Sequence, residues 1–450
     1  MMNDDSFSGK KVLVMGLGIL GGGIGTTEFF CERGAHVTVT DLRNREDLQI
    51  GISQLSKYPI QYVLGEHREE DFQTADIVIR NPGVPLDSPY LQIARDHHVP
   101  IEMAESLFLK LSPTKQLVGV TGTRGKSTTS ALIHRVLKSA GKDSHLAGNQ
   151  KGTSTLQLLN TISKDSIVVL ELSSWQLESF GWHRISPHIA VVTNLYPDHL
   201  NRYRSIEEYA EAKENIFKYQ NKDDYLVLNK NNEQSRKFAE KAKSKVWWFS
   251  ADHWYSDLFP LKIPGEHNRE NAAAASTVGL ILDIDPDIFT SAISSFTGLA
   301  GRLEHIKTFN GVTIINDTTS TTPAAGIAAL NSFPEKKTVV IVGGTSKNLP
   351  TNDLVETIKK RAKAIVLLDG KGTEEIRPLL SDLSIPVVGP YVLLPDAVQA
   401  GLRFADSGDI LLFSPSFPSF AHFKNEFERG EAFTHAVQKI NTTKGKITHS

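Results

Sequence analysis

The chain has 450 residues, of which 40% are hydrophobic and 22% are charged, and its formal net charge is -2. This balance is typical of a globular protein, and it excludes both a disordered chain and a nucleic-acid binder that depends on a basic surface. Because single domains usually hold roughly 100 to 200 residues, two or three domains are expected.

The first residues, MMNDDSFSGKK, are acidic and lead directly into an apolar run, so they lack the basic and apolar regions of a signal peptide. No apolar run approaches the ~18 to 20 residues that span a bilayer. The only cysteine, Cys31, cannot form an internal disulfide. We therefore expect a cytoplasmic protein with neither a membrane nor a nucleic-acid partner.

Short β-branched runs alternate with amphipathic stretches from end to end, which predicts an α/β fold of mostly parallel sheets and crossover helices. We expect three domains: a Rossmann-like N-terminal domain over 1–112, a central P-loop-type ATPase domain over 113–300 and a Rossmann-like C-terminal domain over 301–450. The expected strands are, in chain order, KVLVMG, HVTVTD, YVLGE and ADIVIR; QLVGVTG, IVVLEL, IAVVTNL, YLVLN and VWWFS; and VTIIND, KTVVIVGG, AIVLLDG, IPVVG and DILLFSP.

The first expected strand runs into a glycine-rich turn. Gly16, Gly18 and Gly21 fit the pattern G-x-G-x-x-G, and Asp41 ends the next strand, as in a dinucleotide-binding unit. Alone, this fingerprint favours an NAD-binding oxidoreductase, or a nucleotide sensor that carries a separate NTPase module. A tight turn between strand and helix that binds no ligand is the structural alternative.

The second block opens with GVTGTRGKSTT, a glycine loop between a strand and a helix. Such a loop turns successive backbone N–H groups inward, and the helix N-terminus adds partial positive charge for a phosphate. Lys126 would reach the β- and γ-phosphates, and the Ser127 hydroxyl would bind Mg²⁺. The strict pattern G-x-x-x-x-G-K-[ST] fails, because Val120 occupies its first glycine position. The predicted ATP contacts in this loop are Gly122, Thr123, Arg124, Gly125, Lys126, Ser127 and Thr128.

Two charged residues downstream occupy unusual positions. Glu171 ends the strand IVVLEL, where ligand sites of parallel sheets lie, and it could hold a second Mg²⁺ or simply favour the next helix N-terminus. Lys213 lies on the apolar face of the helix SIEEYAEAKENIFKY. A stem that snorkels to solvent and a functional role both remain open for this lysine.

The loop form T-G-T-x-G-K-[ST] resembles that of the Mur ligases and the folylpolyglutamate synthases, which use ATP to make an amide through an acyl phosphate. ELSSWQLE, TNLYPDHLNRY, AGNQKG and GEHNREN also resemble Mur ligase motifs, and the resemblance runs in order from Gly16 to Gly430. It implies ATP and Mg²⁺ as cofactors and the addition of D-glutamate to UDP-N-acetylmuramoyl-L-alanine in peptidoglycan precursor synthesis. A relative that adds L-glutamate is the alternative within the class. A folylpolyglutamate synthase fits less well, because it lacks a separate N-terminal uridine-nucleotide domain.

The resemblance also assigns roles to single residues of the central block. It implies that His199 helps to bind metal and substrate, and that Lys213 is carbamylated and helps to position Mg²⁺. Asn268 and Asn271 match asparagines that approach the nucleotide base, although a helix cap and a surface position would also explain them. The implied metal set is Ser127, Glu171, His199 and carbamylated Lys213, and the implied catalytic set is Lys126, Glu171, His199, Lys213 and Arg302. Arg124 and Asn201 depart from the asparagine and aspartate usual at these positions.

In the first domain the resemblance converts the dinucleotide fingerprint into a site for the UDP-linked substrate. The expected contacts of that substrate are Gly16, Gly18, Ile19, Leu20, Gly21, Asp41, Arg43, Asn81, Gly83, Asn149 and His199. A dehydrogenase would gain nothing from an ATP loop with a two-metal carboxylate set. The expected partners are small-molecule substrates, and we expect a monomer.

In the third domain Arg302 is implied to lie near the ATP phosphates, and Asp317 would suit the hydroxyl pair of a ribose. The residues implied to hold glutamate are Thr321, Lys347, Ser419 and Phe420, each of which could otherwise be surface polarity or packing. Two positions depart from the family pattern: Gly301 stands where a histidine is usual, and Thr319 stands where a lysine is usual.

Overall fold

The computed structural model describes residues 6–18, 22–149, 154–198, 202–253, 260–380, 383–419 and 422–440. The chain forms two compact units, one of Met1–Phe259 with Arg269–Ile293 and one of Pro260–Asn268 with Ser294–Ser450. Each unit is described by itself. No helix in the described ranges is long and apolar enough to cross a membrane.

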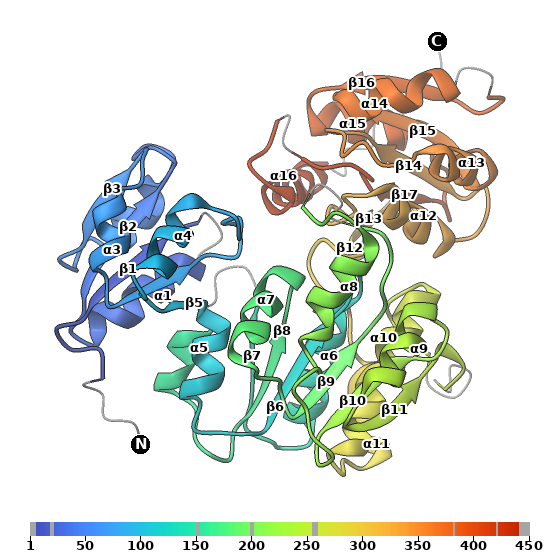
Figure 1. Ribbon diagram of the computed structural model, residues 1–450. Helices are drawn as coiled ribbons and strands as arrows, with labels where there is room; N and C mark the ends of the chain where they lie inside the picture. The colour runs from blue at the N-terminus through green and yellow to red at the C-terminus, as the bar shows by residue number, and fades with distance from the viewer. Residues whose placement is uncertain are drawn as a thin grey trace. The chain divides into compact units, whose positions relative to one another are not determined.

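The first unit begins with a five-stranded parallel sheet in the order β3-β2-β1-β4-β5 (Figure 1). Val12 and Val14 of β1 pack with α1 on one face of the sheet, and Leu13 and Met15 pack with α3 and α4 on the other. The strands are β1 Lys11–Met15, β2 His36–Asp41, β3 Gln61–Leu64, β4 Ile77–Arg80 and β5 Ile101–Glu102. The helices are α1 Gly22–Glu32, α2 Gln49–Gln54, α3 Glu69–Thr74, α4 Pro89–Asp96 and α5 Ala104–Leu111.

A second parallel sheet follows in the same unit, in the order β11-β10-β9-β6-β8-β7. Its strands are β6 Leu117–Thr121, β7 Ser144–Gly148, β8 Ile167–Glu171, β9 Ile189–Val192, β10 Tyr225–Asn229 and β11 Lys245–Phe249. The α-helices between and after the strands of this sheet are α6 Lys126–Ser139, α7 Ser174–His183, α8 Ile206–Glu214, α9 Glu233–Lys241, α10 Glu266–Ile281 and α11 Pro286–Ser294. Short 3₁₀ turns lie at Leu156–Asn160 and Ala251–His253.

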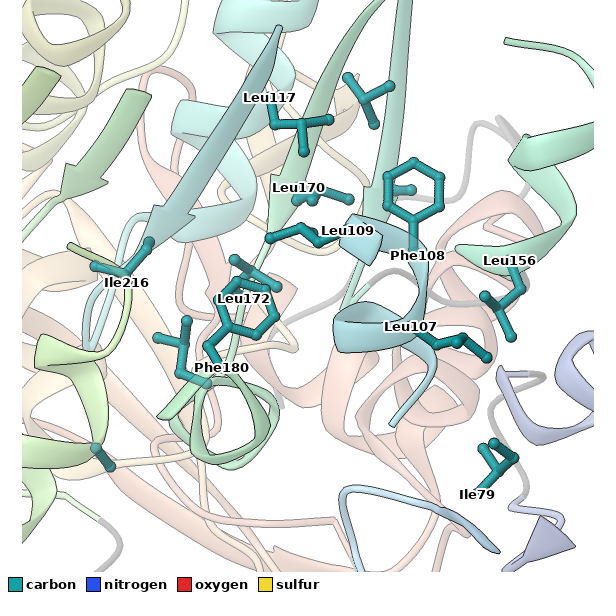
Figure 2. Packing of buried hydrophobic residues seen from close by; sticks show 14 of the residues in the cluster. Ile79, Leu107, Phe108, Leu109, Leu117, Leu156, Leu170, Leu172, Phe180 and Ile216 are labelled. Atoms are coloured by element: carbon teal, nitrogen blue, oxygen red, sulfur yellow. The ribbon is translucent and has the colours of Figure 1, made fainter. Parts of the chain in front are cut away.

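Helix α5 joins the two sheets of the first unit through one continuous apolar cluster. Figure 2 shows Phe108 and Leu109 of α5 beside the strands that carry Leu117 and Leu170, and Leu107 on the side of Ile79. All six side chains are less than 10% exposed, so their burial contributes on the order of 1.5–3 kcal/mol each. This packing fixes the end of β4 relative to the central sheet.

The second unit holds a six-stranded sheet in the order β12-β13-β17-β14-β15-β16, parallel except for the edge strand β12. Helices α12 and α13 cover one face, and α15 and α16 cover the other. The strands are β12 Glu304–Phe309, β13 Val312–Asn316, β14 Thr338–Val342, β15 Ala362–Leu368, β16 Val387–Tyr391 and β17 Ile410–Phe413. The helices are α12 Pro323–Asn331, α13 Asn352–Arg361, α14 Lys371–Ile376, a 3₁₀ turn Arg377–Leu380, α15 Leu394–Leu402 and α16 Glu426–Gln438.

The α/β fold predicted from the alternating pattern is confirmed, and every expected strand is present. Three strands were not predicted: β5, β7 and β12. The first two complete the edges of their sheets, and the third is the antiparallel strand of the second unit.

Glu105 on α5 is a buried carboxyl group whose pKa predicts a pH-dependent stability. Burial raises the pKa of Glu105 above its usual value, and hydrogen bonds from Gln176 and Thr155 oppose this rise only in part. Between the unfolded and folded pKa values the folded protein keeps a proton that the unfolded chain releases. This group therefore stabilises the fold at low pH, and its contribution falls as pH rises, by at most about 1.4 kcal/mol per pH unit.

We expect Glu105→Gln to flatten this dependence, because the amide has no proton to lose. The measurement is the apparent melting temperature between about pH 5 and pH 8. Glu211→Gln, which changes an exposed glutamate on α8, is the control and should follow the unmodified protein. Identical pH profiles for all three proteins would contradict a protonated Glu105.

Candidate ATP and substrate site

The glycine loop lies between β6 and α6, as predicted. Gly125 precedes α6 with a φ of 80°, and a Cβ atom there would lie 2.4 Å from Asn271 Oδ1. Glycine is therefore required at this point of the loop. Asn271, on α10, also accepts a hydrogen bond from Thr129 Oγ1 at 3.1 Å. The structure thus places Asn271 against the loop and the first turn of α6.

The backbone of Arg124 is held from both sides by Asn194. Asn194 Oδ1 accepts from the Arg124 N–H at 3.0 Å, and Asn194 Nδ2 donates to the Arg124 carbonyl at 3.2 Å. Thr193 Oγ1 donates to the same carbonyl. These contacts use only the main chain of Arg124. Asn194 and Thr193 thus hold this point of the loop through main-chain groups.

Two lysine side chains converge on one carbonyl of the loop. Lys126 Nζ donates to Gly122 O at 2.9 Å and to Thr123 O at 3.1 Å, and Lys213 Nζ donates to Gly122 O at 3.0 Å. Lys213 is 1% exposed, which excludes a snorkelling stem. Burial, and then the charge of Lys126, lower the pKa of Lys213 well below its ordinary value. The ammonium group of Lys213 therefore loses its proton more easily than that of an exposed lysine.

Glu171 lies beside the loop, because β8 pairs with β6 in a register that sets Glu171 opposite Val120. Its side chain is 2% exposed. Asn149 follows β7, and its Nδ2 donates to Glu171 Oε1 at 3.2 Å while its N–H donates to the Glu171 carbonyl at 2.8 Å. The structure therefore brings together the predicted metal ligand Glu171 and the predicted substrate contact Asn149.

The N-terminal glycine turn is closed by Asp41. Asp41 Oδ2 accepts from the Leu17 N–H at 3.0 Å and pairs with Arg43 at 2.9 Å. Burial tends to raise the pKa of Asp41, but its hydrogen bonds and the Arg43 charge outweigh burial and lower it. Asn81 lies against the turn, since a Cβ atom on Gly16 would lie 2.9 Å from Asn81 Cβ. Most predicted UDP contacts of this domain thus form one cluster.

Some predicted site residues lie outside the described ranges and are given no structural account. They are Ile19, Leu20, Gly21, His199 and Phe420. Gly18, which precedes the first of these gaps, and Gly83, whose N–H donates to Asn81 Oδ1 at 3.1 Å, belong to the described N-terminal cluster.

In the second unit Asp317 already has partners for both carboxylate oxygens. Asp317 Oδ1 accepts from the Leu303 N–H at 3.2 Å, and Oδ2 accepts from Ser414 Oγ at 2.9 Å. The carboxylate therefore fixes the backbone next to Arg302, which is partly exposed. Asn268 Nδ2 donates to the Pro264 carbonyl at 2.6 Å.

The predicted glutamate contacts are only partly gathered. A small, open pocket lies at the carboxyl ends of β14, β15 and β16, and Ser419 lines it beside Asp369 and His422. Ser419 is 4% exposed, and its hydroxyl has no hydrogen-bond partner among the described residues. Thr321 and the exposed Lys347 do not line this pocket.

Sequence reasoning missed several residues that shape the site. Asn194 belongs to the quoted stretch TNLYPDHLNRY but received no role, although its position two residues after a buried strand was a usable signal. Thr121 was also missed, and its Oγ1 donates to the Leu172 carbonyl at 2.7 Å and accepts from Lys213 Nζ at 3.3 Å. Asn194 holds the loop through the main chain of Arg124, whereas Thr121 contacts Leu172 and Lys213 beside it.

Comparison with protein-family models gives three matches in chain order. Residues 10–102 match the Mur ligase MurD-like N-terminal domain, residues 120–279 the Mur ligase middle domain and residues 301–417 the Mur ligase glutamate ligase domain.

Relatives of known name match over almost the full length. The UDP-N-acetylmuramoylalanine–D-glutamate ligase of Roseiflexus sp. is 41% identical, over 96% of this chain and 99% of its own. The ligase of the same name from Acetivibrio thermocellus is 35% identical, over 96% and 97%. Among solved structures, UDP-N-acetylmuramate-alanine ligase from Thermotoga maritima shares the fold, with a TM-score of 0.63, 21% identity and coverage of 95% of this chain and 99% of that one. The chain belongs to the Mur ligase family, in the branch of the UDP-N-acetylmuramoylalanine–D-glutamate ligases.

Proposed function

We propose that the protein uses ATP to join D-glutamate to UDP-N-acetylmuramoyl-L-alanine, forming an amide, ADP and phosphate. The observation that carries the proposal is the convergence of Lys126 and Lys213 on Gly122 O, at the N-terminus of α6. The Lys126 ammonium group and a helix N-terminus supply the positive field that a transferring phosphoryl group requires, and Lys213 lies beside them at the same carbonyl. An oxidoreductase would have no use for this arrangement.

The chemistry follows from the weak electrophilicity of a carboxylate. The substrate carboxylate attacks the γ-phosphorus, the bond from that phosphorus to the β,γ-bridging oxygen breaks, and ADP leaves. The glutamate nitrogen then attacks the acyl carbon, the amine loses a proton, and the carbon–oxygen bond to phosphate breaks. Lys126 and the loop N–H groups stabilise the charge that develops on the phosphoryl oxygens.

The residues near the loop fit a nucleotide-bound Mg²⁺. In the described ranges, no group of three histidine, cysteine, aspartate or glutamate side chains is placed to hold a metal ion by itself. Mg²⁺ bound with ATP usually takes one or two protein oxygens and completes its shell with phosphates and water. Ser127 and Glu171 would supply those oxygens, and we assign a carbamate on Lys213 and the His199 nitrogen as further groups that would help to hold the ion. The ion would supply neutralisation of phosphate charge.

The three substrates are assigned to different parts of the chain. The Asp41 and Asn81 cluster would hold the UDP moiety, the loop at 122–128 with Asn271 would hold ATP, and Arg302 with the Ser419 pocket would serve the phosphates and glutamate. The support is the clustering of residues in the first two parts and, for the third, the position of Ser419 at the pocket. We also propose domain boundaries at 112/113 and 300/301, a monomer and a cytoplasmic location. Light scattering would test the monomer.

Phosphate release tests the reaction directly. We expect release from ATP only when UDP-N-acetylmuramoyl-L-alanine and D-glutamate are both present, because the acyl phosphate needs the first substrate and its turnover needs the second. Phosphate is measured in a coupled assay, and the amide product by mass spectrometry. Release that is indifferent to the UDP-linked substrate would contradict the proposal.

Replacing D-glutamate by L-glutamate is the matched control for substrate class. We expect little release with the L-enantiomer. A preference for L-glutamate would move the protein to the related L-glutamate-adding activity and would leave the assignment of the ATP loop intact.

A further inference from the structure

Glu178 on α7 binds three side chains from two distant segments of the first unit. Its Oε2 accepts from Arg80 at 3.1 Å and from Arg202 at 3.2 Å, and its Oε1 accepts from the Tyr203 hydroxyl at 3.1 Å. The Glu178 side chain is 7% exposed, Arg80 is fully buried and Arg202 is 17% exposed. One carboxylate therefore satisfies two guanidinium groups where little water can replace it.

Both arginines also bind the turn that contains Asn81, Pro82 and Gly83. Arg80 Nε donates to the Val84 carbonyl at 2.9 Å, which closes the base of the turn. Arg202 NH1 donates to the Pro82 carbonyl at 3.3 Å, which contacts its tip. The turn is thus held at both points by arginine side chains that also donate to the same oxygen, Glu178 Oε2.

Arg202 is also oriented from its other side. Its guanidinium lies 4.4 Å from the ring centroid of Trp175, one turn before Glu178 on α7. Stacking and a carboxylate together restrict the planar guanidinium to one orientation. Arg202 and Tyr203 directly follow residues 199–201, which include the predicted substrate and metal contact His199.

We propose that Glu178 is a positioning residue for the UDP-linked substrate, which acts by holding the 81–83 turn and the segment after His199 at a fixed separation. This inference rests on the proposed function for the identity of the substrate. It assigns Glu178 no contact with a reacting atom. The ATP loop has its own supports in Asn194 and Thr193, so Glu178 should affect one substrate and not the other.

The variant is Glu178→Gln, which keeps the shape but removes the charge shared by two arginines. We expect KM for UDP-N-acetylmuramoyl-L-alanine to rise by roughly tenfold or more, since a small displacement of positioning groups has effects of this size. KM for ATP should stay unchanged. An unchanged KM for the UDP-linked substrate, or an equal rise in all KM values, would overturn the inference.

Glu102→Gln is a matched control for loss of stability. Glu102 is 6% exposed and accepts from Ser106 Oγ at 2.9 Å. It also pairs with Lys110 of α5 and with His183, the last residue of α7, the helix that carries Glu178. It is a comparable buried ion-pair centre that does not touch the 81–83 turn. We expect it to lower the melting temperature without changing the KM for the UDP-linked substrate. A KM rise equal to that of Glu178→Gln would show a merely structural effect and overturn the inference.

A measurement without substrate separates this inference from the proposed function. Amide hydrogen exchange at Gly83 and Val84 should accelerate in Glu178→Gln and not in Glu102→Gln, because only the former loosens the turn. Unchanged exchange there would refute the positioning role whatever the substrate is. If Glu178→Gln does not fold, Arg202→Lys takes its place. An ammonium group lacks the planar fork with which the guanidinium binds both Glu178 and the Pro82 carbonyl. This variant should give the same KM and exchange pattern, and unmodified behaviour would refute the role.

Discussion

Lys126→Ala is expected to lower kcat by about 10²- to 10³-fold, the usual effect of removing one preorganised charge from a transition state. Lys126 Nζ donates to the Gly122 and Thr123 carbonyls of the loop. A phosphoryl group bound there would attract the same ammonium group more strongly than the carbonyls do. The variant should fold normally, because these two hydrogen bonds join the side chain only to carbonyls of its own loop.

The test is steady-state turnover, together with the melting temperature of each variant. Lys138→Ala, at the exposed C-terminal end of the same helix, removes an equal charge and should retain full activity. If Lys126→Ala turned over at the normal rate, the loop at 122–128 would not be the site of phosphoryl transfer.

The sequence predicts the central strands well because their signal comes from burial. Strands such as Ile167–Glu171 are buried at every position, and continuous β-branched runs are typical of parallel strands covered on both faces. The helical spacing that set Lys213 on an apolar face was likewise confirmed by its burial. Where packing dictates residue type, the sequence is therefore informative.

The missed strands lack this signal for physical reasons. Ser144–Gly148, read as SHLAG, has no β-branched residue and ends in a glycine. Ile101–Glu102 has only two residues. Glu304–Phe309 is a half-exposed edge strand whose side chains are mostly polar or charged. Each is stabilised by its neighbour in the sheet, and no local pattern reveals that neighbour.

The two departures from the family pattern in the second unit look independent in sequence but are neighbours in the fold. Thr319 donates to the Gly301 carbonyl through both its N–H, at 3.1 Å, and its Oγ1, at 3.0 Å. Thr319 therefore fixes the backbone immediately before Arg302. The threonine at 319, where a lysine is usual, and the glycine at 301, where a histidine is usual, are therefore in direct contact. Their positions in the sequence do not reveal this contact.

Most of the site depends on contacts that cross long stretches of chain. Glu178 and Arg80 are 98 positions apart, and Asn194 and Arg124 are 70 apart. The spacing of these residues in the sequence does not indicate which side chain or main-chain group each one bonds. Residue types at motif positions identified the chemistry, whereas the supports of the loop and of the 81–83 turn needed the structure.

Lys213→Ala and Lys213→Arg are both expected to lower kcat by about 10²- to 10³-fold, if a carbamate at this position helps to hold the Mg²⁺ that would neutralise phosphate charge. Lys213 Nζ lies at the loop carbonyl of Gly122 and 4.7 Å from the Tyr209 ring centroid, fully enclosed. Burial lowers the pKa of the Lys213 ammonium. The neutral amine can then form a bond to the carbon of CO₂ and release a proton, which leaves an anionic carbamate.

Arginine is the informative replacement, because its guanidinium stays protonated and cannot form a carbamate under the same conditions. If Lys213 served only as a cation, Lys213→Arg would retain much of the activity lost in Lys213→Ala. Lys218→Ala, which removes an exposed lysine beyond the end of α8, should behave as the unmodified enzyme. Incubation with ¹³CO₂ should give a carbamate ¹³C signal that both Lys213 variants lack. Activity losses without that signal in the unmodified enzyme would mean that Lys213 acts as the amine itself, and full activity of both variants would remove it from the site.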